Sequence, residues 1–194
     1  MTTKNPVVLV HGIKDTSKKM EPMARFLRTG DWEVYSISLK PSWGEVGIEQ
    51  LALQLKQFID SNITPGRDFD LVGFSMGGLV SRYYLQRLGG LDRVKRFIKL
   101  ATPHHGTVIA WLGWNTGCQQ MRPNSLFLQD LNRDLPTLEQ TQFTSIWTPL
   151  DLMILPADSS RTGLGREIKI WMPAHPLMVL HPKCIRAVAA ELTR

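Results

Sequence analysis

The chain has 194 residues, of which 43% are hydrophobic, and a formal net charge of +6. This length is sufficient for one domain with a sizeable core, and the hydrophobic content excludes a disordered chain. The basic residues are scattered and no nucleic-acid-binding motif accompanies them, so we expect no nucleic-acid partner. A mild basic cluster lies between Arg82 and Lys99. We interpret this cluster as a solvated face, with attraction to anionic lipid as the second interpretation.

Apolar runs that predict strands alternate along the chain with amphipathic patterns that predict helices. The strands are predicted at residues 7–10, 32–38, 70–74, 94–101, 143–147 and 167–172. The clearest helical patterns lie at residues 20–27, 48–59, 79–85, 125–131 and 185–192, whereas residues 108–140 are irregular apart from the helix they contain. This alternation predicts a mostly parallel α/β sheet with helices on both faces, in a single domain over residues 1–194.

The third predicted strand ends in Gly73-Phe74-Ser75-Met76-Gly77 and passes directly into a helix. A serine at the apex of so sharp a turn needs flanking glycines, because a Cβ there would collide with the neighbouring strand or helix. The turn exposes the hydroxyl of Ser75 and directs the amide of Met76 toward the same point. We therefore interpret Ser75 as a catalytic nucleophile; the alternative is an incidental serine in a glycine-rich turn.

A serine nucleophile needs a general base, which in α/β-hydrolases lies late in the chain. His175 follows the last predicted strand directly, in a loop expected to face Ser75. His181 is the alternative, but it precedes Pro182 at the predicted start of the terminal helix, where a polar residue is typical of a helix cap. We favour His175 as the base.

The base in turn needs an orienting carboxylate after a strand that follows the nucleophile. Asp151 lies just past the strand that ends at Trp147. Asp158 is the alternative, in a turn-rich loop where aspartate is common for structural reasons alone. We favour Asp151.

Stabilising an oxyanion requires two amides, of which Met76 supplies one. The second is expected in the loop after the first strand, where Gly12 permits close approach of the main chain and Ile13 is our candidate. We interpret His11 as a residue that orders this loop. His104 and His105 follow another strand, and hydrogen bonding within their loop is favoured over catalysis.

Five motifs occur in a fixed order over nearly the whole chain. They are Val-His-Gly-Ile at 10–13, Gly-Phe-Ser-Met-Gly-Gly at 73–78, Ala-Thr-Pro-His-His-Gly-Thr at 101–107, Thr-Ser-Ile-Trp at 144–147 followed by Asp151, and the His175 loop before the last helix. Together they resemble a small bacterial lipase of the α/β-hydrolase superfamily. The resemblance implies a compact α/β-hydrolase fold with little or no lid, and hydrolysis of acylglycerols or related carboxylic esters.

The resemblance also implies specific roles for the residues found above. It implies that Ser75, Asp151 and His175 form a catalytic triad and that Ile13 and Met76 provide the oxyanion amides. Three positions depart from the lipase pattern. Phe74 stands where His is frequent, Ala101 replaces a common Gly, and the catalytic loop reads Ala-His-Pro rather than Gly-His.

The tryptophans of the irregular stretch suggest a site for lipid. Trp111 and Trp114 lie shortly after the end of a predicted strand, at the side of the sheet where the turn at Ser75 is expected to open. An acyl chain needs an apolar wall, and indole rings suit a boundary between lipid and water. We expect the stretch from Val108 to Gly117 to line the acyl site or to touch a lipid surface; ordinary packing against the sheet is the alternative.

Several functions share these residues. The leading hypothesis is a serine ester hydrolase, lipase-like; the alternatives are an acyltransferase or thioesterase with the same triad, and a non-catalytic binding protein on a hydrolase scaffold. We expect no cofactor and no metal, because Cys118 and Cys184 lack metal-ligand spacing and are expected to be unpaired thiols. No signal peptide is visible, so we expect a cytoplasmic protein, with secretion as the alternative if the sequence has been trimmed. We also expect a monomer, and transient contact with a membrane surface is a further expectation.

Overall fold

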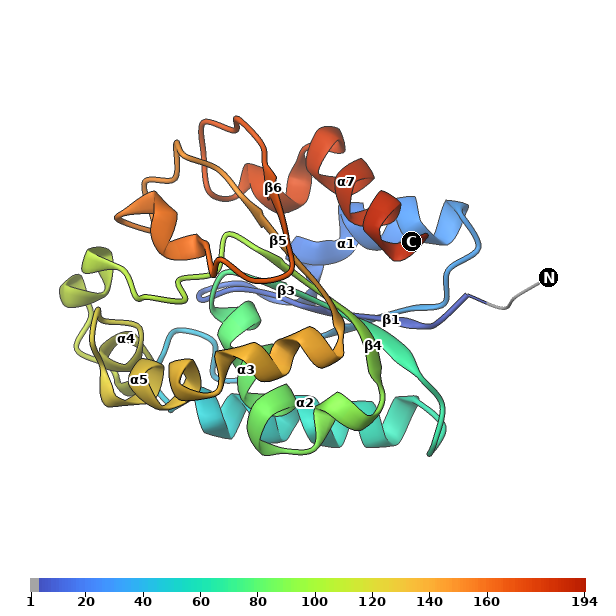
Figure 1. The fold of residues 1–194 in the computed structure, drawn as a ribbon, viewed down its shortest axis with the longest axis horizontal. Coiled ribbons are helices and arrows are strands. Elements are labelled where there is room, and N and C mark those ends of the chain that lie inside the picture. The colour runs from blue at the N-terminus through green and yellow to red at the C-terminus, as the bar shows by residue number, and fades with distance from the viewer. Residues whose placement is uncertain (1–3) are drawn as a thin grey trace.

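The computed structural model describes residues 4–194 and contains a six-stranded sheet in which every neighbouring pair of strands is parallel (Figure 1). The strand order is β2-β1-β3-β4-β5-β6. The bounds are β1 Val7–Val10, β2 Val34–Ile37, β3 Phe69–Phe74, β4 Val94–Leu100, β5 Gln142–Trp147 and β6 Arg166–Lys169. The predicted parallel α/β sheet is confirmed, and all six predicted strands are present, although β6 ends three residues early.

Helices cover both faces of this sheet (Figure 1). Their bounds are α1 Ser17–Thr29, α2 Ile48–Asn62, α3 Met76–Arg87, α4 Thr116–Gln120, α5 Leu126–Arg133, α6 Leu177–Leu180 and α7 Pro182–Leu192. Helices α1 and α7 pack on one face, and α2 and α3 pack on the other. The stretch that the sequence left irregular is largely helical, because 3-10 turns at Val108–Leu112 and Leu135–Gln140 flank α4 and α5.

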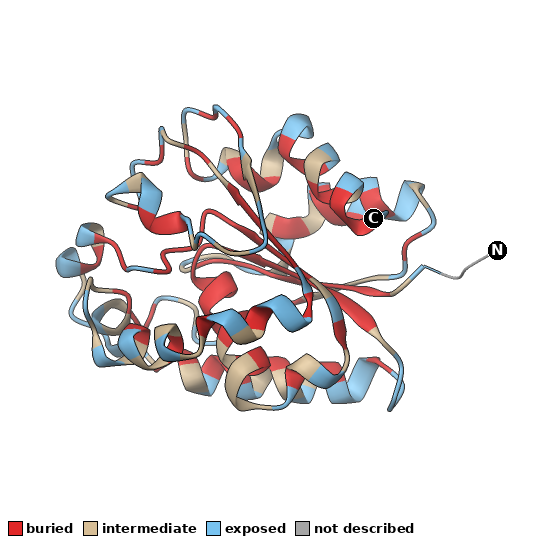
Figure 2. Ribbon diagram, viewed as in Figure 1, coloured by how far each residue is buried: buried red, intermediate tan, exposed pale blue. Residues whose placement is uncertain are grey.

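The central strands are buried on both faces, as their continuous apolar runs require (Figure 2). In β1, Val8 and Val10 pack toward α2 and α3, while Val7 and Leu9 pack toward α1 and α7. Each side chain of the strand therefore enters a hydrophobic core. The outer faces of the helices are exposed, and this includes Phe26, which falls within the apolar spacing of α1 but points away from the sheet.

The expectation of a solvated basic face between Arg82 and Lys99 is wrong for its two end residues. Both Arg82 on α3 and Lys99 on β4 are fully buried. The guanidinium of Arg82 is bound by the side chains of Gln86, His104 and Asn132 and by the carbonyl of Leu131, and Lys99 donates to the carbonyl of Ser160. Most of these acceptors are distant in the sequence, so no local pattern marks the two charges as buried.

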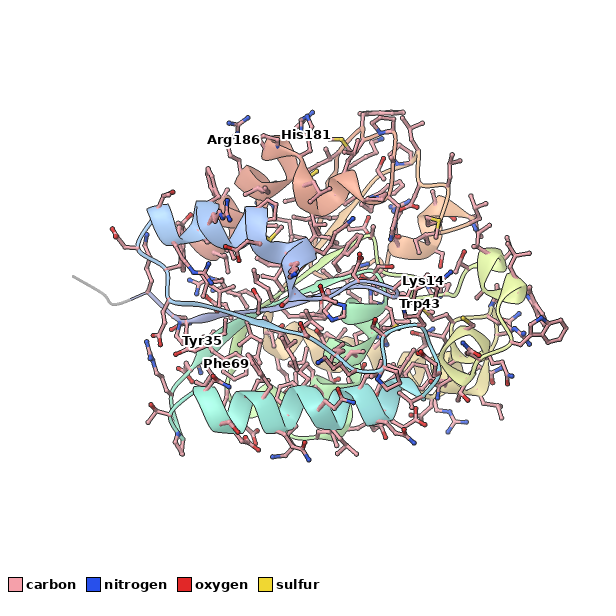
Figure 3. All side chains as sticks on the ribbon, turned by 180° about the vertical axis from the view of Figure 1, so that it is seen from behind. Lys14, Tyr35, Trp43, Phe69, His181 and Arg186 are labelled. Atoms are coloured by element: carbon pink, nitrogen blue, oxygen red, sulfur yellow. The ribbon has the colours of Figure 1, made fainter. Side chains whose placement is uncertain are left out.

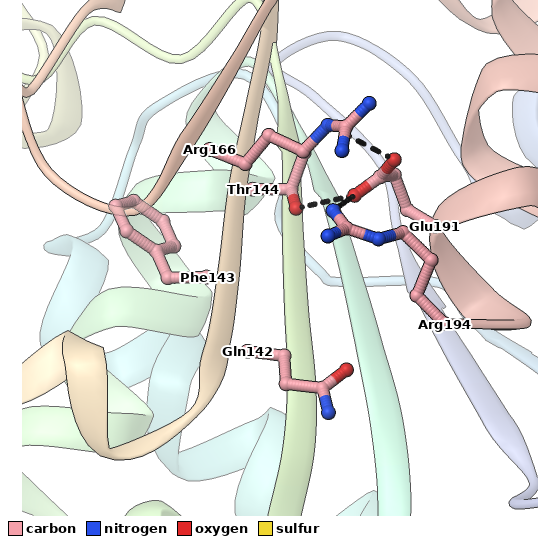
Figure 4. Close-up of a pocket in the computed structure, with 6 residues that line it drawn as sticks. All are labelled: Gln142, Phe143, Thr144, Arg166, Glu191 and Arg194. Atoms are coloured by element: carbon pink, nitrogen blue, oxygen red, sulfur yellow. Dashed lines mark hydrogen bonds and ion pairs between the residues drawn. The ribbon is translucent and has the colours of Figure 1, made fainter.

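An ion-pair cluster attaches the end of α7 to the sheet (Figure 4). The buried carboxylate of Glu191 accepts a hydrogen bond from Thr144 Oγ1 at 3.0 Å on β5. It also pairs with Arg166 on β6 and with Arg194, each at 3.3 Å. Thr144 and Arg166 are paired in register near the beginnings of their strands. These ion pairs hold α7 against the amino-terminal ends of β5 and β6. The loops that follow the strands lie at the opposite, carboxyl-terminal ends.

Candidate active site

Ser75 forms the turn between β3 and α3, with φ 53° and ψ −124°. This conformation is rarely adopted by a residue with a side chain and is typical of a strained functional turn. The turn is possible because the flanking residues are glycines. A Cβ on Gly73 would lie 2.7 Å from the Cα of Gly78, and one on Gly77 would collide with the main-chain oxygen of His11. These contacts confirm that the turn at Ser75 requires glycine at both flanking positions.

Asp151 and His175 are joined by a hydrogen bond of 2.7 Å between Oδ2 and Nδ1. Both side chains are buried. The other carboxylate oxygen, Oδ1, accepts the amides of Met153 at 2.9 Å and Ile154 at 3.0 Å. Because an ionised carboxylate only accepts, Nδ1 carries the proton and Nε2 is left as a proton acceptor. This is the tautomer that a general base requires.

The loops that carry these two residues are held together by Thr148 and Met172. Thr148 Oγ1 donates to the carbonyl of Met172 at 2.8 Å and accepts its amide at 3.1 Å. The ring of Phe74 lies 4.8 Å from the imidazole of His175, measured between centroids, at an angle of 33°. Phe74, one of the departures from the lipase pattern, therefore packs directly against the candidate base.

The alternatives for base and acid lie elsewhere. His181 caps α7, because its Nδ1 accepts the amide of Lys183 at 3.2 Å, as its position before Pro182 predicted. Asp158 lines a separate groove together with His105. Within residues 4–194, no hydrogen bond joins the hydroxyl of Ser75 to His175. Catalytic contacts of this kind are often loose in the absence of substrate, so the triad remains a prediction.

The two candidate oxyanion amides are those of Ile13 and Met76. Neither is hydrogen-bonded to an acceptor in the part of the chain that the structure describes. His11 orders the loop that carries Ile13, as expected: its Nε2 accepts the amide of Leu39 at 2.9 Å and its Nδ1 lies 2.8 Å from the carbonyl of Gly12. Burial lowers the pKa of His11, which favours the neutral ring that this arrangement needs.

His104 is buried in a different environment. Its Nδ1 lies 2.8 Å from a guanidinium nitrogen of Arg82, and because arginine only donates, Nδ1 is the acceptor. The proton is therefore on Nε2, which has no partner within residues 4–194. Burial, with the charges of Lys99 and Arg82, holds the pKa of His104 well below its usual value. The ring is therefore bound to Arg82 on α3 and not within its own loop, so the predicted hydrogen bonding within the loop is wrong for this side chain.

An apolar cavity of about 380 Å³ opens beside Ser75. Its other lining residues are Ile13, Lys14, Pro103, Thr107, Ile109, Ala110, Leu112, Gly113, Cys118, Met121, Met153 and Ile154. The predicted segment supplies four of them, but Trp111 and Trp114 do not line the cavity and are 57% and 83% exposed. Met121 and Met153 were missed because their loops are far apart in the sequence, and no local pattern marks them.

The potential metal ligands and thiols form no further site. Within the described residues, no group of three or more His, Cys, Asp or Glu side chains is placed to hold a metal ion. Cys118 and Cys184 are unpaired, as the sequence predicted, and burial raises the pKa of both thiols.

Comparison with solved structures places this fold among the α/β-hydrolases. The mature Bacillus licheniformis lipase BlEst2 superposes with a TM-score of 0.80 at 19% identity, covering 99% of this chain and 93% of that one. Aspergillus fumigatus lipase B gives a TM-score of 0.79 at 17% identity, with 98% and 53% covered. The expected α/β-hydrolase fold is confirmed.

Sequence comparison identifies the family. Palmitoyl-protein thioesterase 3 of Dictyostelium discoideum is 23% identical over 111 residues, which is 55% of this chain and 38% of the relative's length. The family model for palmitoyl protein thioesterase matches residues 6–115, a segment that includes Ile13 and Ser75 but neither Asp151 nor His175. Because that match covers more than half of a chain with the hydrolase fold throughout, the protein belongs to the palmitoyl protein thioesterase family.

Proposed function

We propose that the protein is a serine hydrolase that cleaves lipid esters of carboxylic acids through an acyl-enzyme on Ser75. The observation that carries this proposal is the hydrogen-bonded pair of Asp151 and His175 beside an apolar cavity that Ser75 lines. The lipases among the structural neighbours and the thioesterase family both support ester hydrolysis. An intact acid–base pair argues against a non-catalytic binding protein.

The reaction would proceed in two steps. In the first, Nε2 of His175 accepts the proton of Ser75, and Oγ attacks the acyl carbon. The amides of Ile13 and Met76 donate hydrogen bonds to the resulting oxyanion. The tetrahedral intermediate then collapses, and the alcohol leaves with the proton held by His175. In the second step, His175 takes a proton from water as the water oxygen attacks the acyl carbon. The bond from the acyl carbon to Oγ then breaks, His175 returns the proton to Oγ, and the carboxylic acid and free Ser75 are released.

The cavity favours an aliphatic acyl group. Its walls are mostly apolar, and each buried methylene contributes about 0.8 kcal/mol. If that energy is realised in the transition state, kcat/KM rises about fourfold for each methylene until the cavity is filled. The same cavity suits a thioester, for which the first leaving group is a thiol, and the family name makes a thioesterase the second candidate.

A matched panel of substrates tests this proposal. Oxygen esters and thioesters of acetate, butyrate, octanoate and palmitate are compared by kcat/KM with wild-type protein and with Ser75→Ala. We expect longer chains to be preferred, and Ser75→Ala to lower kcat by about 10⁶-fold while leaving the fold intact. Turnover by Ser75→Ala close to that of wild type would contradict the assignment of the nucleophile.

Three further expectations stay as proposals. We infer a lipid ester as the substrate, with water as the acyl acceptor; an acyltransferase would instead pass the acyl group to an added alcohol in the same assay. A monomeric state is checked by light scattering. A cytoplasmic location is checked by fractionation of the cells that express the protein.

A further inference from the structure

Exposed apolar side chains lie on the loops beside the cavity. Six of them, which we call the apolar rim, are Trp43, Trp111, Leu112, Trp114, Leu152 and Met153. Leu112 is 80% exposed and Met153 is 45% exposed, yet both also line the cavity beside Ser75. The cavity therefore opens within the rim, so that anything docked on the rim covers the entrance to the site.

The rim comes from three loops that are hydrogen-bonded to one another. Asn115 Nδ2 donates to the carbonyl of Trp43 at 3.3 Å and thereby joins the loop after β2 to the segment after β4. Thr107 Oγ1 donates to the carbonyl of Met153 at 2.9 Å and thereby joins that segment to the loop after β5. The carboxyl ends of parallel strands share one edge of a sheet, which is the edge where α4 and α5 lie (Figure 1). The rim is therefore one surface.

Positive charge lies beside the exposed indole rings at this edge. The pairs are Lys14 over Trp43 at 5.0 Å, Arg122 over Trp111 at 4.3 Å and Lys169 over Trp171 at 5.5 Å, measured to the ring centroid. Figure 3 shows Lys14 and Trp43 together at this end of the molecule. The carboxylate of Glu45 accepts the amide of Trp43 at 2.7 Å and offsets one of these charges. Cations remain in excess, in a protein of net charge +6.

We propose that the apolar rim docks on the surface of an anionic lipid bilayer and that the cavity draws its acyl substrate from that surface. Indole rings insert at the level of the headgroups, and lysine or arginine beside them meets the negative charge of the leaflet. No helix of residues 4–194 has the length and the apolar character required to span a bilayer. This inference extends the proposed function, because it names where the lipid ester is met.

Binding to vesicles tests the docking separately from catalysis. The Ser75→Ala protein is used throughout, since docking does not need the nucleophile. Its bound fraction is measured by flotation with phosphatidylcholine vesicles and with vesicles that contain about 30 mol % phosphatidylglycerol. We expect strong binding to the anionic vesicles alone, and weaker binding as salt is raised. An esterase-active protein that binds neither vesicle would overturn the docking and leave the proposed function standing.

Paired variants identify the surface. Trp114→Ala with Leu152→Ala is expected to lower vesicle affinity at least about tenfold, because both lose apolar area at the lipid boundary. Its control is Phe26→Ala with Leu53→Ala, two exposed apolar residues on α1 and α2. Arg122→Gln with Lys169→Gln is expected to lower affinity about thirtyfold, and Lys183→Gln with Arg186→Gln on α7 is the control. Equal effects of rim and control pairs, or equal binding to both vesicles, would contradict the proposal.

Discussion

Two buried histidines that follow strands of the same sheet, β4 and β6, have opposite partners at Nδ1. His175, after β6, has the carboxylate of Asp151 at its Nδ1. His104, after β4, has the guanidinium of Arg82 at its Nδ1. Asp151 accepts a hydrogen bond from Nδ1–H and leaves Nε2 free to act as a base, while Arg82 donates a hydrogen bond to Nδ1 and leaves the proton on Nε2. The partner of Nδ1 therefore determines whether Nε2 of a buried histidine can accept a proton or already carries one.

The residues around the two imidazole rings also differ. His175 and Asp151 lie on loops next to Ser75 and the amides that have no acceptor in the described chain, which is a pattern suited to charge that develops during a reaction. Around His104, Arg82 and Lys99 are buried with no carboxylate of residues 4–194 in hydrogen-bond contact, and burial lowers the pKa of Arg82 to about 9. Burial of these two charges without a carboxylate partner disfavours the folded state.

The largest expected effect is a loss of kcat when the partner of His175 is changed, in contrast to a change at His104. Asp151→Asn is expected to lower kcat by about 10⁴-fold, because the amide favours the wrong imidazole tautomer. His104→Gln keeps an acceptor for Arg82, and its kcat is expected to stay within about threefold of wild type. Steady-state hydrolysis of a butyrate ester measures both, with circular dichroism as the check on folding. Loss of activity in His104→Gln alone would reverse the assignment.

A smaller effect concerns the pH dependence of stability in the His104 cluster. Burial and the charge of Arg82 hold the pKa of Lys99 well below its usual value. The unfolded state therefore binds more protons, and wild-type stability rises as pH rises from the lowered folded pKa toward about 10.4. Lys99→Met is expected to be about 2 kcal/mol more stable at the low end of that window, with the gain shrinking toward its upper end.

Guanidinium chloride unfolding across that pH range measures this difference. The carbonyl of Ser160 keeps its hydrogen bond from Ser145 Oγ at 3.1 Å, so the substitution leaves no unpaired acceptor there. A gain in stability that does not change with pH would show that Lys99 is not the group that titrates.

The smallest expected effect concerns His181. His181→Ala removes the cap of α7 and is expected to lower the free energy of unfolding by about 1 kcal/mol, with kcat unchanged. Thermal unfolding and ester hydrolysis on the same preparation measure both quantities. A variant that is inactive but fully stable would make His181 the base in place of His175.

The parts of this molecule that the sequence predicted are those with local causes. The turn at Ser75 follows from the sterics of Gly73 and Gly77, and the cap at His181 follows from Pro182. The pairing of Asp151 with His175 was reached by chain order, because residues after parallel strands meet at one edge of the sheet.

The features that were missed depend on groups that are far apart in the sequence. Lys99 is satisfied by the carbonyl of Ser160, which is 61 residues away, and nothing in the side-chain sequence marks a carbonyl as a partner. The cavity wall likewise combines Met121 and Met153 from separate loops. Trp111 and Trp114 were placed on the correct segment, but the turn at Val108–Leu112 directs Ile109 and Leu112 to the cavity instead.

Covalent labelling of the nucleophile tests the central claim most directly. Wild-type protein is treated with a fluorophosphonate probe, digested, and analysed by mass spectrometry, with Ser75→Ala and Asp151→Asn treated in parallel. We expect one adduct on the peptide that contains Ser75, none in Ser75→Ala, and much slower labelling in Asp151→Asn. Folded wild-type protein that takes no label, or takes it at another residue, would contradict an acyl-enzyme on Ser75.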